Sequence, residues 1–108
     1  MAFDPRLVER VRAELAGRAD VTERKMFGGV AFLLGDRMVC GVHGRELIVR
    51  LDPEDAAAAL AEPNTREFDG SDEATRGWIV VQARGLVAPE MLTRWVRRAL
   101  ESAAEQAR

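Results

Sequence analysis

Side chains that commonly carry out chemistry are scarce in this chain. It has one cysteine, Cys40, one histidine, His43, and no tyrosine. A single cysteine cannot form an internal disulfide, so we expect a protein of a reducing compartment, the cytoplasm. Cys40 and His43 stand three residues apart in a predicted strand, which places them on opposite faces and argues against a nucleophile–base pair. We expect Cys40 to lie in the core and His43 to close a turn opposite Glu46.

The sequence also lacks a long apolar run and an excess of basic charge. No hydrophobic stretch approaches roughly 18 residues, so we expect no membrane-spanning segment. The first ten residues lack the apolar core of a secretory signal. Sixteen basic residues stand against eighteen acidic ones, for a net charge of −2. Nucleic-acid-binding domains usually carry a strong basic excess, so direct DNA or RNA binding is disfavoured, although the charge does not exclude it.

The hydrophobic residues that are present suffice for one small core. They make up 47% of the 108 residues, which favours a single globular domain spanning residues 1–108. Helix-capping signals predict three helices. Asp4 and Asp52 are suited to the N-cap, each followed by a proline at the first helical position, and Pro89 opens the last helix. Each of these starts precedes apolar residues at helical spacing or an alanine-rich segment.

Apolar segments separated by glycines predict strands between the helices. The expected strands span residues 21–27, 30–34, 37–43, 46–51, 66–68 and 78–83. Gly35-Asp36 and Gly44-Arg45 each begin with glycine, as two-residue type II′ hairpin turns do. Gly28-Gly29 is interpreted as a bulge or tight turn, because no helix follows it that could form a phosphate-binding loop. These segments predict an antiparallel sheet.

The predicted turns determine which residues share a face of the sheet. If Leu34 pairs with Arg37 and the alternation continues without a break, Phe32 lies opposite Val39. One face is then wholly apolar, and we expect the helices to pack on it. This face is predicted to carry Ala31, Leu33, Met38, Cys40, Val42, Leu47, Val49 and Leu51.

The second face of the predicted sheet is only partly apolar, and it is the main clue to function. An exposed apolar patch with a polar rim is typical of an interaction site. The residues predicted to bind a partner there are Val30, Phe32, Val39, Ile48 and Arg50. A second copy of the chain is the simplest partner. The alternative is that the last helix, or Met91 within it, covers this face and makes a third layer.

Two short motifs identify a family resemblance. The first consists of Met26, Phe27, Gly28 and Gly29, and the second of Gly77 and Trp78. On a frame of helix, strands, helix, strand and helix, the chain from about Phe3 to Leu100 resembles the N-terminal domain of the TfoX/Sxy family, the regulators of natural competence in bacteria. The motif residues are expected to have structural roles. Competence regulators carry a second, C-terminal helical domain that these 108 residues do not include, so we expect a stand-alone version.

The resemblance implies both a fold and a function. The expected fold is α+β, of two layers in the order α-β(n)-α-β-α, with an antiparallel sheet and helices packed on one face, as in secretion chaperones. The expected function is that of a non-enzymatic regulatory module that binds other proteins. Its expected partners are a second copy of the chain, which makes a homodimer, and a regulatory protein.

An alternative function is that of a nucleic-acid-associated transcriptional regulator that uses arginine-rich surface strips. The candidate strips consist of Arg24, Lys25, Arg50, Arg94, Arg97 and Arg98. Nearby glutamates dilute the charge of the last three. We predict no catalytic, cofactor-binding or metal-binding residues, because the sequence contains no nucleophile–base pair, metal-ligand spacing or nucleotide-binding loop.

Overall fold

The computed structural model describes residues 3–26, 28–68 and 77–106. Its helices are α1 (Pro5–Glu14), α2 (Pro53–Leu60) and α3 (Pro89–Gln106), and a 3-10 turn, η2 (Ala83–Leu86), precedes α3. Its strands are β1 (Val21–Met26), β2 (Gly29–Leu34), β3 (Arg37–His43), β4 (Glu46–Arg50), β5 (Thr65–Glu67) and β6 (Trp78–Val81). Within the described ranges, these strands form one antiparallel sheet in the order β1-β2-β3-β4-β6-β5.

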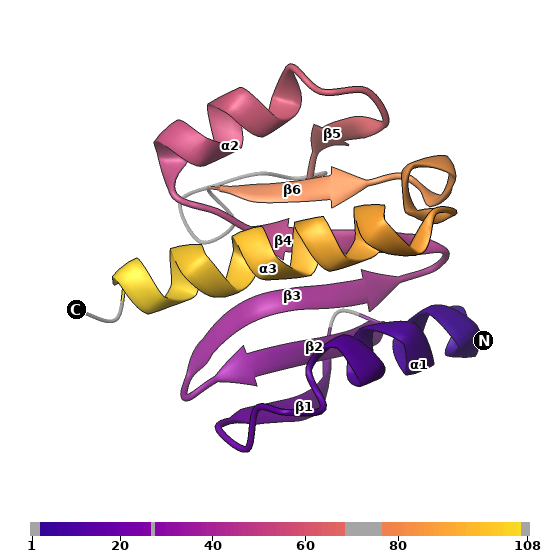
Figure 1. Ribbon diagram of the computed structural model, residues 1–108, viewed down its shortest axis with the longest axis vertical. Helices are drawn as coiled ribbons and strands as arrows, with labels where there is room; N and C mark the ends of the chain where they lie inside the picture. Colours follow the sequence, from indigo (N-terminus) through magenta and orange to yellow (C-terminus); the bar gives the residue numbers. More distant parts are fainter. Residues whose placement is uncertain (1–2, 27, 69–76, 107–108) are drawn as a thin grey trace.

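The helices and the sheet form two layers. Helix α3 lies across β3 and β4, α1 lies beside it over the β1–β2 side, and α2 stands at the end of the sheet near β5 and β6 (Figure 1). Trp95, Val96 and Leu92 of α3 are buried against this face of the sheet. The predicted α+β fold, with helices packed on one face of an antiparallel sheet, is confirmed.

Capping residues determine where α1 begins, as the sequence predicts. The backbone N–H of Arg6 donates to the Asp4 carboxylate at 2.9 Å, and Pro5 occupies the first turn. Further along, the Arg12 guanidinium ties α1 to β1 by bonding both carboxylate oxygens of Glu23, at 2.5 and 3.0 Å. This contact holds the pKa of Glu23 below its usual range.

The two glycine-led hairpin turns are confirmed. Leu34 pairs with Arg37 across the first turn, and His43 pairs with Glu46 across the second. In each turn the glycine has a positive φ and the residue after it does not, as a type II′ turn requires. The turns therefore fix the ends of β2, β3 and β4 in the predicted register.

A β-bulge in β3 breaks the predicted alternation between those ends. Leu33 pairs with Met38, whereas Phe32 pairs with Cys40, so Val39 is an extra residue on β3. The predicted pairing of Phe32 with Val39 is therefore wrong. Because the bulge inserts one residue, Val39 and Cys40 both belong to the helix-covered core, and the β2 residues from Val30 to Leu33 lie on the faces opposite to those predicted.

The bulge reverses part of the predicted face assignment. Val30, Phe32 and Val39, predicted on the second face, belong to the helix-covered core and are 6%, 1% and 0% exposed. Three residues predicted under the helices lie on the opposite face instead: Ala31, Leu33 and Met38. The rest of the assignment holds. Ile48 lies on the second face, as predicted, and the residues after the bulge that were predicted to face the helices do so: Cys40, Val42, Leu47, Val49 and Leu51.

Candidate functional site

The second face of the sheet carries its own small apolar cluster, which we call the second-face cluster. It consists of Ala31, Leu33, Met38, Ile48 and Val80, with Met26, Phe68 and Trp78 packed against it. The first five side chains are buried, whereas the last three are partly exposed. The rings of Phe68 and Trp78 meet edge to face with centroids 5.0 Å apart. Helix α3, which contains Met91, packs on the opposite face, so the alternative in which the last helix covers this face is wrong.

Of the five residues predicted to bind a partner, Arg50 alone keeps a substantial exposed surface. Val30, Phe32, Val39 and Ile48 are all buried and leave almost no side-chain surface for a partner. Arg50 is half-buried and pairs with Trp78 at the margin of the second-face cluster. Burial and the nearby charge of Arg37 lower its pKa. A role for Arg50 in partner binding stays a prediction.

The family motifs occupy the turns around this cluster. Gly28 has a φ of +76° in the β1–β2 turn, and Met26 pairs with Gly29 across it. Phe27 lies outside the described residues. Gly77 has a φ of +88° and its carbonyl accepts the N–H of Leu51 at 2.9 Å, which joins the start of β6 to the end of β4. Gly28 and Gly77 thus supply backbone conformations that other residues rarely adopt.

Cys40 and His43 do not form a reactive pair. Cys40 is completely buried, and burial raises the pKa of its thiol to about 12. His43 is exposed at the end of β3, opposite Glu46. A thiol with so high a pKa remains protonated at neutral pH, and the thiolate is the nucleophilic form, so Cys40 is a core residue.

We expect the Cys40 thiol to be inert in the folded protein. A disulfide reagent such as DTNB should release no chromophore from native protein at pH 8, and one equivalent after unfolding in urea, because burial blocks access and suppresses the thiolate. Absorbance at the wavelength of the released thiolate measures the stoichiometry. Rapid stoichiometric labelling of the native protein would contradict the buried position of Cys40.

The predicted arginine strip on α3 is largely engaged within the protein. Glu62 bonds Arg94 at 3.1 Å and Arg98 at 2.7 Å. The Arg98 guanidinium also lies 4.5 Å from the centre of the Trp95 ring. Two of the three arginines thus already have a carboxylate partner, which reduces the charge that a phosphate backbone would meet.

A carboxylate cluster stands where α2 begins and α3 ends. Oxygens of Asp52, Asp55 and Glu105 lie within 4.8 Å of one another. The Ser102 hydroxyl donates to Asp55 at 3.3 Å and accepts the N–H of Asp52 at 3.4 Å. These bonds join the start of α2 to the end of α3 and so explain why Asp55 lies here. We assign no metal ion to the cluster.

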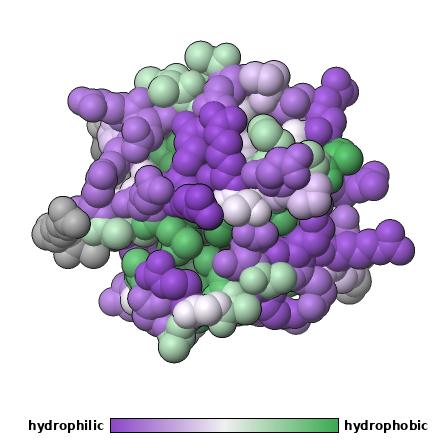
Figure 2. Space-filling view, in the orientation of Figure 1, coloured by the Kyte–Doolittle hydropathy of each residue, from purple (hydrophilic) through white to green (hydrophobic). Residues whose placement is uncertain are grey.

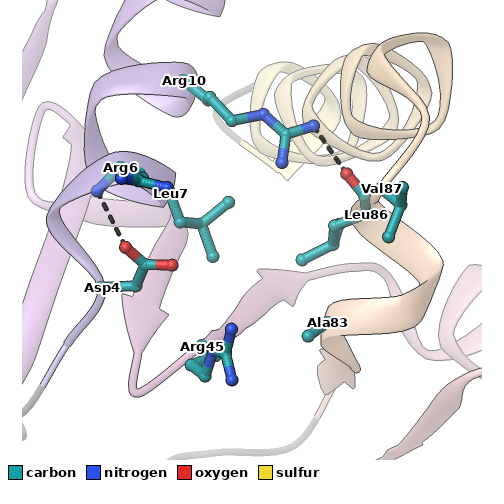
Figure 3. A pocket seen from close by; sticks show the side chains of 8 residues that line it. All are labelled: Asp4, Arg6, Leu7, Arg10, Arg45, Ala83, Leu86 and Val87. Atoms are coloured by element: carbon teal, nitrogen blue, oxygen red, sulfur yellow. Dashed lines mark hydrogen bonds between the residues drawn. The ribbon is translucent and has the colours of Figure 1, made fainter.

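A pocket that the sequence did not reveal lies where α1, the β3–β4 turn and η2 meet (Figure 3). Its volume is about 260 Å³. The Asp4 N–H donates to the carbonyl of Gly44 at 2.7 Å, which brings the start of α1 to the turn. Arg10 donates to the carbonyl of Leu86 at 2.6 Å, which joins α1 to η2. Since its walls come from three distant segments, no local motif could have predicted it.

The helix side of the molecule is mostly polar. Figure 2 shows this side, on which apolar side chains gather in one hollow next to α3. Partly buried hydrophobic residues at the margin of the main core include Val21, Leu34 and Leu100. Among the described helices, none combines the length and the apolar composition that crossing a membrane requires.

Comparison with known proteins gives one finding. Residues 13–103 match the family model of the TfoX N-terminal domain. No curated protein and no solved structure matches the chain. The match covers most of the chain and includes both motifs, the described strands, α2 and most of α3, but only the last two residues of α1.

Proposed function

The chain belongs to the TfoX N-terminal domain family, and we propose on this basis that it is a non-enzymatic regulatory module that acts through protein contacts in the cytoplasm. Membership in a family of regulators is the observation that carries this proposal. The proposed contacts are a self-association on the second face of the sheet and the binding of a regulatory protein.

The partly exposed margin of the second face, around its buried centre, supports self-association. Within the described ranges, no helix lies on this face, and its margin consists of Met26, Phe68 and Trp78, residue types that are enriched at protein interfaces. The rim carries both charges, Arg50 and Glu46, and Glu46 is bonded to Arg66 at 2.8 Å. In a two-fold dimer the same patch meets itself, so a rim of mixed charge can place opposite charges in contact.

We expect replacement of Met26 by glutamate to convert a dimer into a folded monomer. Met26 is partly exposed at the end of edge strand β1, so a charge there can be solvated in the monomer but would be desolvated between two copies. Light scattering after size exclusion measures the mass, and circular dichroism shows that the variant is folded. Ala58→Glu on the exposed side of α2 is the matched control and should leave the mass unchanged. A wild-type monomer, or a dimer insensitive to Met26→Glu, would refute self-association on this face.

The nucleic-acid alternative has less support. The protein carries a net charge of −2, and Glu62 already binds two arginines of the α3 strip. Of the remaining basic side chains of this proposal, Arg24 and Arg50 pair with residues of the second face, whereas Lys25 pairs with Val30 of the helix-covered face. The three therefore do not share one face of the sheet. We therefore prefer a protein partner.

A further inference from the structure

We propose that the pocket between α1, the β3–β4 turn and η2 binds an acidic segment of a partner protein, in which a carboxylate contacts arginines and a neighbouring apolar side chain packs on Val87. This inference rests on the proposed function in one respect, that the occupant is a protein. It concerns the helix-side end of the sheet, away from the second-face cluster.

The charges in the pocket favour an anion. Arg6 and Arg45 border it, and Arg10 reaches across it to Leu86 (Figure 3). Within the described parts of the chain, the side chains of Arg6 and Arg45 make no hydrogen bond or ion pair. The pocket lining includes one carboxylate, that of Asp4, and it already accepts the backbone N–H of Arg6. Three guanidinium groups and one carboxylate leave an excess of positive charge.

The geometry of guanidinium groups makes a carboxylate a suitable ligand. Each guanidinium has five N–H donors in a plane and can bond both oxygens of a carboxylate. Among the described residues, the Arg10 side chain makes one hydrogen bond, at 2.6 Å to the Leu86 carbonyl, and this bond holds the side chain across the pocket. Arg6 and Arg45 come from two different elements, α1 and the turn before β4, so one carboxylate entering between them could be bonded from two directions.

The apolar wall of the pocket distinguishes a peptide from other anions. Leu7 and Leu86 are buried beneath the pocket, whereas Val87 is 76% exposed and is the one large hydrophobic side chain so exposed among the described residues. A phosphate or a nucleic-acid backbone would satisfy the arginines and leave Val87 in water. A segment with adjacent acidic and apolar residues would satisfy the arginines and cover Val87.

The walls of the pocket are held in place by the fold. The Asp4–Gly44 bond fixes the start of α1 against the β3–β4 turn. The N–H of Gln82, just before η2, donates to the carbonyl of Asn64 at 2.8 Å, and Gly85 within η2 donates to Gln82 at 2.9 Å. A site with walls fixed before binding loses less conformational entropy when a ligand enters.

The test is a titration of ¹⁵N-labelled protein with an acetylated, amidated hexapeptide of alternating glutamate and leucine, followed by NMR. We expect amide shifts at Arg6, Arg45 and Val87. Arg45→Glu should weaken the fitted Kd about tenfold or more, since charge-assisted hydrogen bonds are lost and repulsion replaces them. The matched control, Arg97→Glu, reverses an exposed charge on α3 outside the pocket and should leave the Kd unchanged.

Three results would overturn the proposal. These are equal binding of a peptide with glutamine in place of glutamate, equal weakening by Arg97→Glu, and the same shifts at lower concentration with inorganic phosphate or duplex DNA. The last would make the pocket a phosphate or nucleic-acid site. Light scattering on the same samples separates the two proposals: peptide binding by a monomer supports this site without the dimer, and a dimer that shows no peptide-induced shifts supports the dimer without this site.

Discussion

Replacement of Phe32 by glutamate is expected to unfold the protein. Phe32 is 1% exposed within the helix-covered core, and removal of a buried phenylalanine side chain typically costs about 3–5 kcal/mol. A buried carboxylate without a partner adds a desolvation cost. Because small domains are stable by only about 5–15 kcal/mol, the two costs together should remove most of the folded population. Far-UV circular dichroism during urea unfolding measures the loss.

A surface position tests whether the effect of Phe32→Glu comes from burial. Val87→Glu introduces the same charge at a side chain that is 76% exposed, and its free energy of unfolding should stay within about 0.5 kcal/mol of the wild type. A Phe32→Glu protein with a cooperative transition near that of the wild type would contradict the burial of Phe32 in the helix-covered core.

Replacement of Gly77 by alanine is the second change expected to have a large effect. Gly77 has a φ of +88°, and an added Cβ would overlap the carbonyl oxygen of Leu51. The overlap is with backbone, which cannot rotate away as a side chain can. Strain from the positive φ costs roughly 1–2 kcal/mol, and overpacking typically costs about 1–3 kcal/mol more. We therefore expect the free energy of unfolding to fall by about 3 kcal/mol, as measured by urea unfolding.

Gly35→Ala is the matched control for that substitution. Gly35 also has a positive φ, +64°, but a Cβ there would meet nothing within 4 Å. It should therefore show the conformational strain alone, of about 1–2 kcal/mol. Equal losses in the two variants would mean that the contact between Gly77 and Leu51 contributes nothing to the requirement for glycine.

The turns could be predicted from the sequence because their chemistry is local. Glycine stands first in Gly35-Asp36 and in Gly44-Arg45 because that position of the turn has a positive φ. The residues that flank these turns, Leu34 with Arg37 and His43 with Glu46, pair as predicted. The short edge strand, predicted at residues 66–68, is present as β5 (Thr65–Glu67). Caps and turns involve neighbours in the chain, so a single sequence contains the information.

The bulge at Val39 could not be predicted because both registers bury apolar residues. From Val30 to Leu34 every β2 residue is apolar, and the β3 residues that pair with them are also largely apolar. Moving β2 by one position therefore exchanges one hydrophobic set for another, and alternation carries no signal. The tertiary structure makes the choice, since Phe32 fills the core beneath the helices and Ala31 lies on the second face.

The residues that line the pocket follow no pattern along the sequence. Arg6, Arg45 and Val87 are each unremarkable surface residues in the sequence, and they come together only because η2 folds back beside the start of α1 (Figure 3). The apolar residues predicted on one sheet face do follow a pattern in the sequence, but most of them lie in the core. Exposed arginines in separate segments carry no spacing pattern that could have joined them.

The strand order affects the order in which the sheet can assemble. Strands β1 to β4 are neighbours both in the sheet and along the chain, so each pairing closes only a short turn. Strand β6 reaches β4 only after the intervening α2 and β5 segment, and the pairing of Arg50 with Trp78 closes a much longer loop. Helix α3, which covers the apolar side of β3 and β4, follows all of the described strands along the chain. During synthesis the meander can therefore pair before α3 is made, and the apolar side of β3 and β4 stays open to contact with other nascent chains until α3 packs on it.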